Sequence, residues 1–410
     1  MQKVPDFAQS NVQMEELLVK SAFLVLRVHT GFKRYLYRQI NWNNRLIAII
    51  GPRGTGKTTL LLQKLHELDK SPTVAAYFSL DDLYFTTNSL VATAEDFYRK
   101  GGKHLFLDEV HKYPGWARHI KNLYDFYPDL QIVFTGSSII NIAREEVDLS
   151  RRARMYELQG LSYREYLAYT GVLQTEPFQL EELLTTNYPW QKKFPAGFLP
   201  LQHFTDYLTY GYYPFFTEDP EGFPLRIQQL VRLIVEYDMA ELNDFDIRNA
   251  KKLLQLLYIL SANVPFKPNL SSLSEKSNIH RNSINNYLLF LEQARLIRLL
   301  YPSGISVSVL QKPEKIYLDN TNLAHALSQQ HPDKGNLRET FFLNQVSSLH
   351  HVSYPQKGDF MVNEKWVFEV GGKTKSGSQV KEVPNSFIVQ DDVAFPVGDV
   401  LPLWLFGFLY

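Results

Sequence analysis

The segment RLIAIIGPRGTGKTTLLLQKL, residues 45–65, constrains the fold of this chain more than any other stretch. An apolar run is followed by a glycine-rich turn that fits G-x-x-x-x-G-K-[ST], and then by a helix-forming run. This order predicts a strand, a phosphate-binding loop, and a helix whose first N–H groups point at an anion. The predicted loop comprises Gly51, Pro52, Arg53, Gly54, Thr55, Gly56, Lys57, Thr58 and Thr59.

Two side chains of this loop have distinct expected roles. Lys57 would reach the β- and γ-phosphates, and the Thr58 hydroxyl is placed to bind the Mg²⁺ that bridges them. Thr59 is expected to pack or to add polar surface at the start of the helix. The alternative is an ordinary glycine turn, but both the spacing and the flanking runs favour a nucleotide phosphate site.

Strands alternate with helices after this loop, which predicts a parallel sheet covered on both faces and hence an α/β fold. The predicted elements are strands at 74–80 and 103–110, a helix at 115–128 and a strand at 130–138. Ligands of such sheets lie beyond the carboxyl ends of the strands. Gly51, Asp108 and Thr135 are therefore expected to converge at that edge.

Two adjacent carboxylates end the strand at 103–110. Asp108 follows an apolar run, where it is poorly placed for packing and well placed to bind Mg²⁺, so we assign it to the metal. We assign Glu109 as the general base that polarises the water attacking the terminal phosphate. A solvated strand end or a helix N-cap is the alternative for a lone Asp-Glu pair, and the upstream loop favours the catalytic role.

Hydroxyl and guanidinium groups follow the next strand. Thr135 or Ser137 is expected beside the same phosphates as a sensor, and a turn or N-cap role is the alternative. One of Arg151, Arg152 and Arg154 is a candidate arginine finger for the nucleotide of a neighbouring subunit. A solvated basic turn explains this cluster equally well.

Composition excludes several kinds of chemistry. The 410 residues contain no cysteine, which excludes disulfides and thiol catalysis and makes the cytoplasm the expected location. Lys plus Arg and Asp plus Glu both number 43, so any basic surface for nucleic acid must be local. No apolar run approaches the roughly 20 residues that span a bilayer, so no membrane partner is expected. Residues 400–410 are expected to form a buried closing strand.

Several of these motifs together carry a family resemblance. GPRGTGKT, LFLDEV with HKYPGW after it, IVFTGSS, and LSRR followed by LQGLSYREYL resemble the prokaryotic AAA+-type ATPases related to archaeal replication-initiator-like ATPases. The resemblance is most specific between residues 45 and 170, and it implies ATP as the nucleotide. It also implies a P-loop ATPase core at 1–160, a helical lid at 161–245, a winged-helix segment at 246–318 and a restriction-endonuclease-like domain at 319–410.

The resemblance extends to the arginine cluster. Arg152 best matches the arginine that follows the last core helix in this family. Arg151 stands where the family usually has a small residue, so the choice among the three arginines stays open. An arginine finger would require the subunits of a homo-oligomer to meet at the nucleotide, and the sequence leaves the oligomeric state open.

The segment from 246 to 318 predicts three helices that lead into a hairpin, which is the order of a winged helix. Residues 278–290 resemble the recognition helix of a DNA reader. The candidate base-contacting residues are His280, Arg281, Asn282, Ser283 and Asn285. Lys312 and Lys315 add a weak signal for phosphate contact. A protein-binding or structural winged helix is the alternative, because Lys and Arg are sparse.

The C-terminal segment carries carboxylates in an order that resembles a restriction-endonuclease-like site. Glu339 lies in a predicted helix, and Asp359 and Glu369 lie in predicted strands. In that fold a Lys two residues after the Glu positions water or phosphate beside a metal. Gly371 occupies that position here, and Lys373 lies further along the strand. Unless a bulge brings this lysine closer, a structural or partner-binding remnant is favoured over an active nuclease.

The motifs and the resemblance together predict an Mg²⁺-dependent ATPase that couples its nucleotide state to the winged helix and the C-terminal domain. The alternatives are a nucleotide-gated protein that binds DNA or a protein partner with little turnover, and an ATP-regulated nuclease. Glu109 distinguishes the ATPase from the nucleotide-gated binding protein, because only ATP hydrolysis needs a general base.

Overall fold

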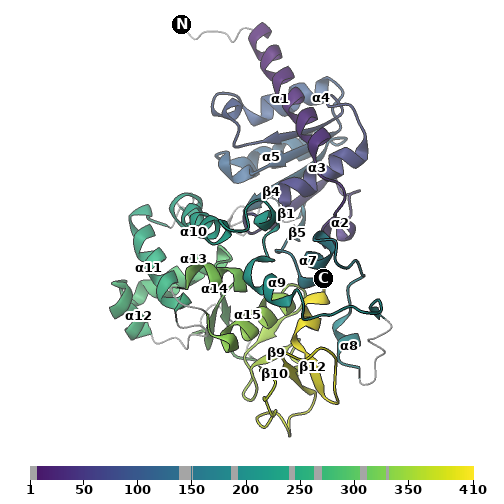
Figure 1. The fold of residues 1–410 in the computed structure, drawn as a ribbon. Coiled ribbons are helices and arrows are strands. Elements are labelled where there is room, and N and C mark those ends of the chain that lie inside the picture. The colour runs from purple at the N-terminus through teal and green to yellow at the C-terminus, as the bar shows by residue number, and fades with distance from the viewer. Residues whose placement is uncertain are drawn as a thin grey trace. The chain divides into compact units, whose positions relative to one another are not determined.

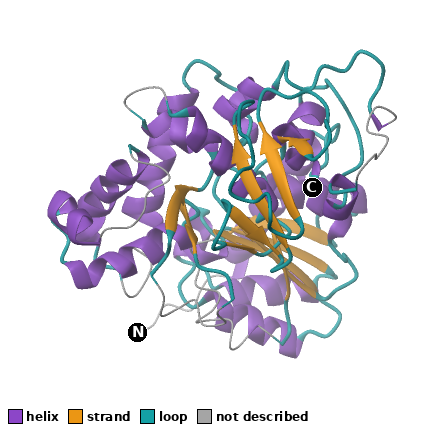
Figure 2. Cartoon of the chain, turned by 90° about the horizontal axis from the view of Figure 1, so that it is seen from below, coloured by secondary structure: helices purple, strands orange, loops and turns teal. Residues whose placement is uncertain are grey.

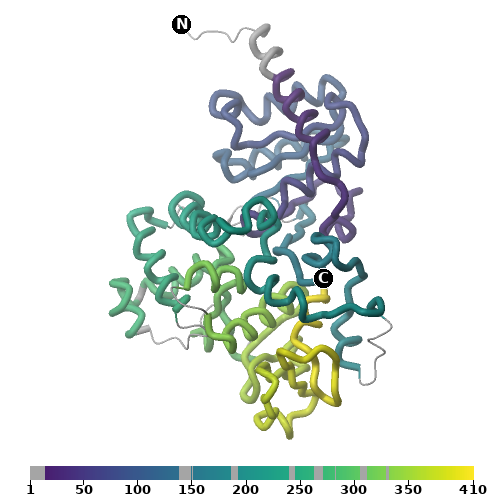
Figure 3. The backbone as a smooth tube through the Cα atoms, in the orientation of Figure 1, coloured from purple at the N-terminus to yellow at the C-terminus, as the bar shows by residue number. Residues whose placement is uncertain are grey.

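The chain divides into an N-terminal unit, residues 1–159, and a C-terminal unit, residues 160–410. The computed structural model describes residues 7–137, 149, 151–185, 193–239, 245–262, 270–304, 312–328 and 332–410. Figure 3 traces the backbone of both units from purple to yellow. The domain boundaries predicted near residues 245 and 318 fall inside the second unit and stay predictions.

Among the described residues of the N-terminal unit, five parallel strands form one sheet in the order β2-β3-β4-β1-β5 (Figure 1). The strands are β1 (Leu46–Gly51), β2 (Ala75–Ser79), β3 (His104–Asp108), β4 (Gln131–Ser137) and β5 (Arg154–Glu157). The central strands are almost wholly buried, which explains their continuous apolar sequences. The predicted α/β class and parallel sheet are confirmed, and helices and strands can be told apart by colour in Figure 2.

Helices cover both faces of this sheet, because successive side chains of a strand point to opposite sides. The helices are α1 (Phe7–Arg27), α2 (Tyr35–Gln39), α3 (Lys57–Leu68), α4 (Leu90–Arg99) and α5 (Trp116–Phe126). Leu105 and Leu107 of β3 pack in one hydrophobic cluster with α4 and α5. Phe106, between them, packs in a second cluster with α2 and α3.

The first part of the C-terminal unit is helical and rich in aromatic contacts. Its helices are α7 (Tyr163–Tyr169), α8 (Leu180–Leu183), α9 (Phe204–Tyr210) and α10 (Phe223–Leu233), followed by the π-helical turn η5 (Ile234–Asp238). Tyr163 contacts Phe204 and Tyr207 with ring centroids 5.2 and 5.4 Å apart. These residues fall in the range expected for a helical lid, a role that stays a prediction.

Helices followed by a strand pair occupy the range expected for a winged helix. They are α11 (Ala250–Ser261), α12 (Leu270–Ser277) and α13 (Arg281–Gln293), then β6 (Ile297–Leu300) and β7 (Lys315–Leu318), which pair antiparallel. The order of elements matches the expected one. Assignment as a winged helix stays a prediction.

A mixed sheet in the order β12-β11-β10-β9-β8 forms the end of the chain. The elements are α14 (Thr321–Leu327), α15 (Lys334–Val346), β8 (Val352–Ser353), β9 (Phe360–Val362), β10 (Trp366–Gly371), β11 (Ser386–Gln390) and β12 (Val400–Pro402). Phe342 of α15 contacts Phe360 and Phe368 of the sheet, with both pairs of ring centroids 5.1 Å apart.

The strand expected over residues 400–410 is wrong beyond Pro402. Residues Leu403–Phe408 form a 3₁₀ helix, η9, although the segment is buried as expected. Proline lacks a backbone N–H and so cannot donate to a ladder, which is consistent with the strand ending at Pro402.

Candidate phosphate-binding site

The loop between β1 and α3 has a backbone that suits its glycines. Gly51, Gly54 and Gly56 have φ angles of 153°, 77° and 93°, a region that other residues rarely adopt. A Cβ at Gly51 would lie 2.2 Å from the carbonyl oxygen of Leu158. Glycine at this position therefore lets the loop lie directly against the backbone that follows β5.

Lys57 is folded back onto this loop. Its Nζ donates to the carbonyl oxygens of Gly51 and Pro52 at 2.8 and 2.9 Å, and the side chain is buried. Thr55 Oγ1 also donates to the Pro52 carbonyl, at 2.9 Å. To reach a nucleotide phosphate as expected, Lys57 would exchange these carbonyl oxygens for phosphate oxygens.

The Asp108 carboxylate is the centre of a buried hydroxyl network. Thr58 Oγ1 donates to its Oδ2 at 2.6 Å, Tyr77 OH donates to the same oxygen at 2.7 Å, and Thr135 Oγ1 donates to Oδ1. Asp108 is only 2% exposed. The structure thus brings together Thr58, Asp108 and Thr135, three residues that the sequence placed at one edge of the sheet.

Tyr77 was missed by the sequence analysis. It lies in β2, next to β3 in the sheet, so its hydroxyl can reach the carboxylate at the end of β3. Burial, followed by the charge of Asp108, raises the pKa of Tyr77 far above its ordinary value, so the phenol remains a hydrogen-bond donor. The available signal was the one tyrosine in the mostly apolar strand β2, but using it requires knowledge of which strand lies next to β2 in the sheet.

The donor set around Asp108 suits Mg²⁺. Thr58 supplies a hydroxyl oxygen next to a carboxylate oxygen, and Mg²⁺ commonly takes one or two protein ligands together with waters and substrate phosphates. Within the described part of the chain, no group of three or more Asp, Glu or His side chains is arranged to hold a metal. A magnesium site here would therefore depend on the phosphates of a nucleotide.

Glu109 is held in a left-handed backbone conformation, with φ 52° and ψ 44°. Its N–H donates to Thr135 Oγ1 at 3.2 Å. Its carboxylate Oε2 lies 3.4 Å from a guanidinium nitrogen of Arg53 and 3.3 Å from Nε2 of His111. Neither contact of this carboxylate was predicted from the sequence.

His111 is neutral at neutral pH. Burial, assisted by the positive charges of Lys112, Arg53 and Lys57, lowers its pKa to about 3. Both of its ring nitrogens are buried, and no hydrogen bond to either is formed with the described residues. His111 therefore faces Glu109 as an uncharged ring.

The remaining predicted residues of the N-terminal unit are a serine of β4 and the three arginines at positions 151, 152 and 154. Ser137 is buried at the end of β4, and Ser138 falls outside the described residues. Arg152 forms a two-point ion pair with Asp125, with N–O distances of 2.9 and 3.0 Å. Arg151 and Arg154 are exposed. The role of an arginine finger stays a prediction for all three arginines.

Two of the predicted DNA-reading residues, Arg281 and Asn285, lie on the exposed face of α13. Ile284, Leu288 and Leu291 are buried, while Arg281 and Asn285 are exposed. His280 is exposed, Ser283 is partly buried, and the side chain of Asn282 lies outside the described residues. An exposed polar face opposite a buried apolar face leaves both DNA and protein binding open.

Lys315 was wrongly placed among the candidate phosphate contacts. It is buried, and its Nζ lies 3.1 Å from Glu339 Oε2 and 3.5 Å from Asp359 Oδ1. Burial alone would lower the pKa of Lys315, but Glu339 and Asp359 outweigh it and the pKa is raised. Lys312 is exposed.

The lysine that reaches the C-terminal carboxylates is Lys375, not Lys373, whose approach the sequence left dependent on a bulge. Lys375 Nζ lies 3.2 Å from Glu369 Oε1 and 3.8 Å from Asp359 Oδ2, whereas Lys373 is exposed. With Lys315, this places two ammonium groups among three carboxylates. Lys375 supplies the one lysine that the resemblance implies, whereas Lys315 is a second ammonium group that contacts Glu339 and Asp359. Among the described residues, no group of three or more His, Asp or Glu side chains is placed to hold a metal ion.

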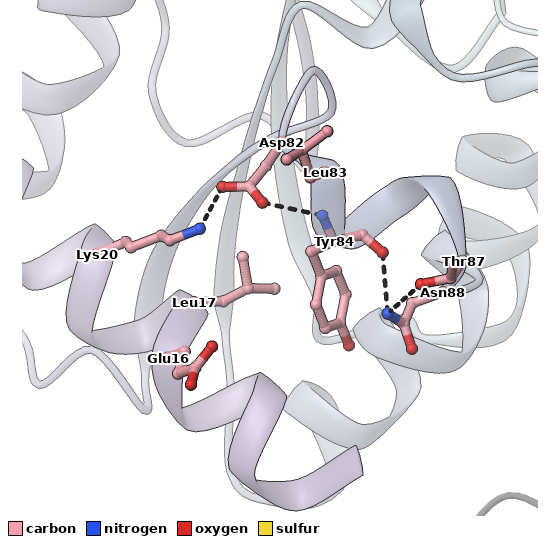
Figure 4. A pocket seen from close by; sticks show the side chains of 8 residues that line it. All are labelled: Glu16, Leu17, Lys20, Asp82, Leu83, Tyr84, Thr87 and Asn88. Carbon is pink, nitrogen blue, oxygen red and sulfur yellow. Dashed lines mark hydrogen bonds and ion pairs between the residues drawn. The ribbon is translucent and has the colours of Figure 1, made fainter. Parts of the chain in front are cut away.

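A pocket of about 280 Å³ lies between α1 and the turn after β2 (Figure 4). Lys20 spans it to form a 2.6 Å ion pair with Asp82, which also accepts a hydrogen bond from the backbone of Tyr84. None of the predicted site residues lines this pocket. Among the described helices, none is long and apolar enough to cross a membrane.

Comparison with known proteins gives matches to two family models. Residues 43–167 match an AAA domain, and residues 201–334 match a domain of unknown function, DUF8612. The uncharacterized protein MJ1637 of Methanocaldococcus jannaschii is 31% identical, in a match that covers 88% of this chain and 85% of that protein. The AAA-domain match supports an ATP-binding ATPase in general terms.

Solved structures resemble the chain only weakly. AMPPCP-bound DnaA from Aquifex aeolicus is 14% identical over 63% of this chain and 84% of its own, with a TM-score of 0.25. The ADP complex of S. cerevisiae Hsp104 is 16% identical over 69% of this chain and 40% of its own, with a TM-score of 0.31. Superpositions with such TM-scores support no inference about this chain.

Proposed function

This chain belongs to the same family as the archaeal protein MJ1637 and carries an AAA domain, and on that premise we propose that it is an Mg²⁺-dependent ATPase. The proposal places ATP on the loop of residues 51–59. Its main support is the buried network in which Thr58 and Thr135 hold Asp108 at the start of α3 and the ends of β3 and β4.

Each residue of the proposed site has one role. Lys57 binds the β- and γ-phosphates, and Thr58 and Asp108 hold the Mg²⁺, which neutralises phosphate charge when bound. Glu109 accepts a proton from the attacking water, whose oxygen forms the new bond to the γ-phosphorus as ADP leaves. Thr135 orients the water or the γ-phosphate. Arg152 is the proposed finger from a neighbouring subunit of a homo-oligomer.

We further propose that the nucleotide state is coupled to the C-terminal unit in the cytoplasm. The exposed face of α13, within residues 278–290, is the proposed surface for DNA or a protein partner. A nucleotide-gated binding protein with little turnover is the second candidate, and the ion pair between Arg53 and Glu109 favours it because it engages the proposed base. An ATP-regulated nuclease is the third candidate, and the second lysine, Lys315, which pairs with Glu339 and Asp359, speaks against it.

Binding and turnover of ATP test the proposal separately. Lys57→Ala is expected to lose ATP binding, whereas Glu109→Gln is expected to bind ATP and lose phosphate release. Lys70→Ala, at an exposed lysine just beyond α3, is the matched control and should behave as wild type. Undiminished turnover in Glu109→Gln would remove the assignment of the base. Tight ATP binding with negligible turnover in the wild type would support the second candidate.

A further inference from the structure

Arg53 and Glu109 connect the phosphate loop to the proposed base. The guanidinium nitrogen and Oε2 are 3.4 Å apart, and both side chains are 22% exposed. Arg53 directly follows Pro52, whose carbonyl oxygen holds the ammonium of Lys57. Arg53 is therefore attached to the loop next to the carbonyl group that Lys57 would leave in order to bind the γ-phosphate.

The γ-phosphate and Glu109 would compete for Arg53. A planar guanidinium pairs strongly with phosphate oxygens, and a triphosphate brings more negative charge to the loop than one carboxylate. His111 touches the same Oε2 without adding charge, because it is neutral. When ATP draws Arg53 away, Glu109 loses this ion pair and can turn to the attacking water.

We propose that Arg53 distinguishes ATP from ADP by exchanging Glu109 for the γ-phosphate. This inference rests on the proposed ATP site and deepens it. Arg53 is thus a specificity-determining residue that also positions the base. ADP lacks the γ-phosphate, so in the ADP-bound protein Arg53 stays paired with Glu109.

A double-mutant cycle on nucleotide affinity tests the exchange in the full-length chain. Dissociation constants for ADP and a non-hydrolysable ATP analogue are measured for wild type, Arg53→Met, Glu109→Gln and the double variant. Arg53→Met should weaken the analogue about tenfold and ADP by less than about twofold, because a charge-assisted phosphate contact is lost. Glu109→Gln should tighten the analogue by about threefold, the scale of a partly exposed ion pair.

The cycle has clear contrary outcomes. The gain from Glu109→Gln must vanish in the Arg53→Met background, and an unchanged gain there would overturn the exchange. Equal weakening of ADP and the analogue by Arg53→Met would also overturn it. Arg53→Lys, which keeps the charge, should recover part of the preference and guards against a folding defect. If wild type binds neither nucleotide, or Lys57→Ala binds both normally, the proposed ATP site itself fails.

Discussion

Gly51→Ala is expected to damage the N-terminal unit more than an ordinary glycine substitution. Its φ of 153° costs an alanine about 1–2 kcal/mol. The new Cβ would also lie 2.2 Å from Leu158 O. Leu158 cannot move freely, since its N–H donates to Ile50 O at 2.8 Å. Overpacking against fixed backbone adds about 1–3 kcal/mol, for a total of about 2–5 kcal/mol.

Gly101→Ala separates the two contributions. Gly101 also has a positive φ, 101°, but a Cβ there meets nothing within 4 Å. Gly101→Ala should therefore lower the free energy of unfolding only by the cost of the unfavourable φ angle, about 1–2 kcal/mol. The difference between the two variants measures the collision with Leu158.

Thermal unfolding followed by circular dichroism provides the measurement. At about 3 °C per kcal/mol for a unit of this size, Gly101→Ala should lower the melting temperature of the N-terminal unit by about 3–6 °C and Gly51→Ala by about 6–15 °C. Gly51→Ala should also weaken ATP binding, because Lys57 contacts the Gly51 carbonyl. Equal shifts for the two variants would refute the steric argument.

Further variants test the network, the histidine, the C-terminal cluster and α13. Tyr77→Phe should raise the Mg²⁺ concentration for half-maximal activity about tenfold, since ligand-orienting partners have effects of this size; unchanged Mg²⁺ dependence would exclude a positioning role. The pKa of His111 in the folded protein is below its ordinary value, so the free energy of unfolding falls as the pH falls from 6.5 to about 3. His111→Gln should make the free energy of unfolding depend less on pH in this range. Lys315→Met should lower the free energy of unfolding, measured in urea, by about 3–5 kcal/mol, because it leaves buried carboxylates without their partner. Lys373→Met, at an exposed lysine, should lower it by less than about 0.5 kcal/mol. Similar losses in both variants would contradict a buried ion-pair cluster around Lys315. Arg281→Ala should weaken duplex DNA binding and its salt dependence, and salt-indifferent binding would argue against phosphate contacts.

Local patterns were enough to predict the glycine-rich turn between β1 and α3 and the α/β class. The strand preceding Gly51 and the helix starting at Lys57 depend on residues adjacent in sequence. The contact of Tyr77 with Asp108 depends instead on which strands are neighbours in the sheet. Pairing between distant strands is decided by the packing of the whole unit, so the sequence pattern could not supply it.

The sequence also did not reveal that Lys375, rather than Lys373, lies beside Glu369, and the reason is again physical. The prediction extended the strand of Glu369 and counted alternate residues along it. The strand β10 ends at Gly371, and Lys375 N donates to Gly372 O at 2.9 Å in a turn. Past a turn, strand alternation no longer decides which side chain faces the carboxylates, so Lys375 reaches Glu369.

In this structure, the two cationic side chains of the loop at residues 51–59 are paired with acceptors of the N-terminal unit. Lys57 bonds to loop carbonyls, and Arg53 pairs with Glu109. From the other side, buried Arg34 donates to Thr55 O at 2.5 Å and to Gln159 O at 2.7 Å, which fixes the loop against the end of the unit. Because these hydrogen bonds already fix the backbone of the loop, ordering the loop would cost little free energy when a nucleotide binds. Its binding would instead consist of exchanging internal acceptors for phosphate oxygens, and only a γ-phosphate would complete the exchange at Arg53.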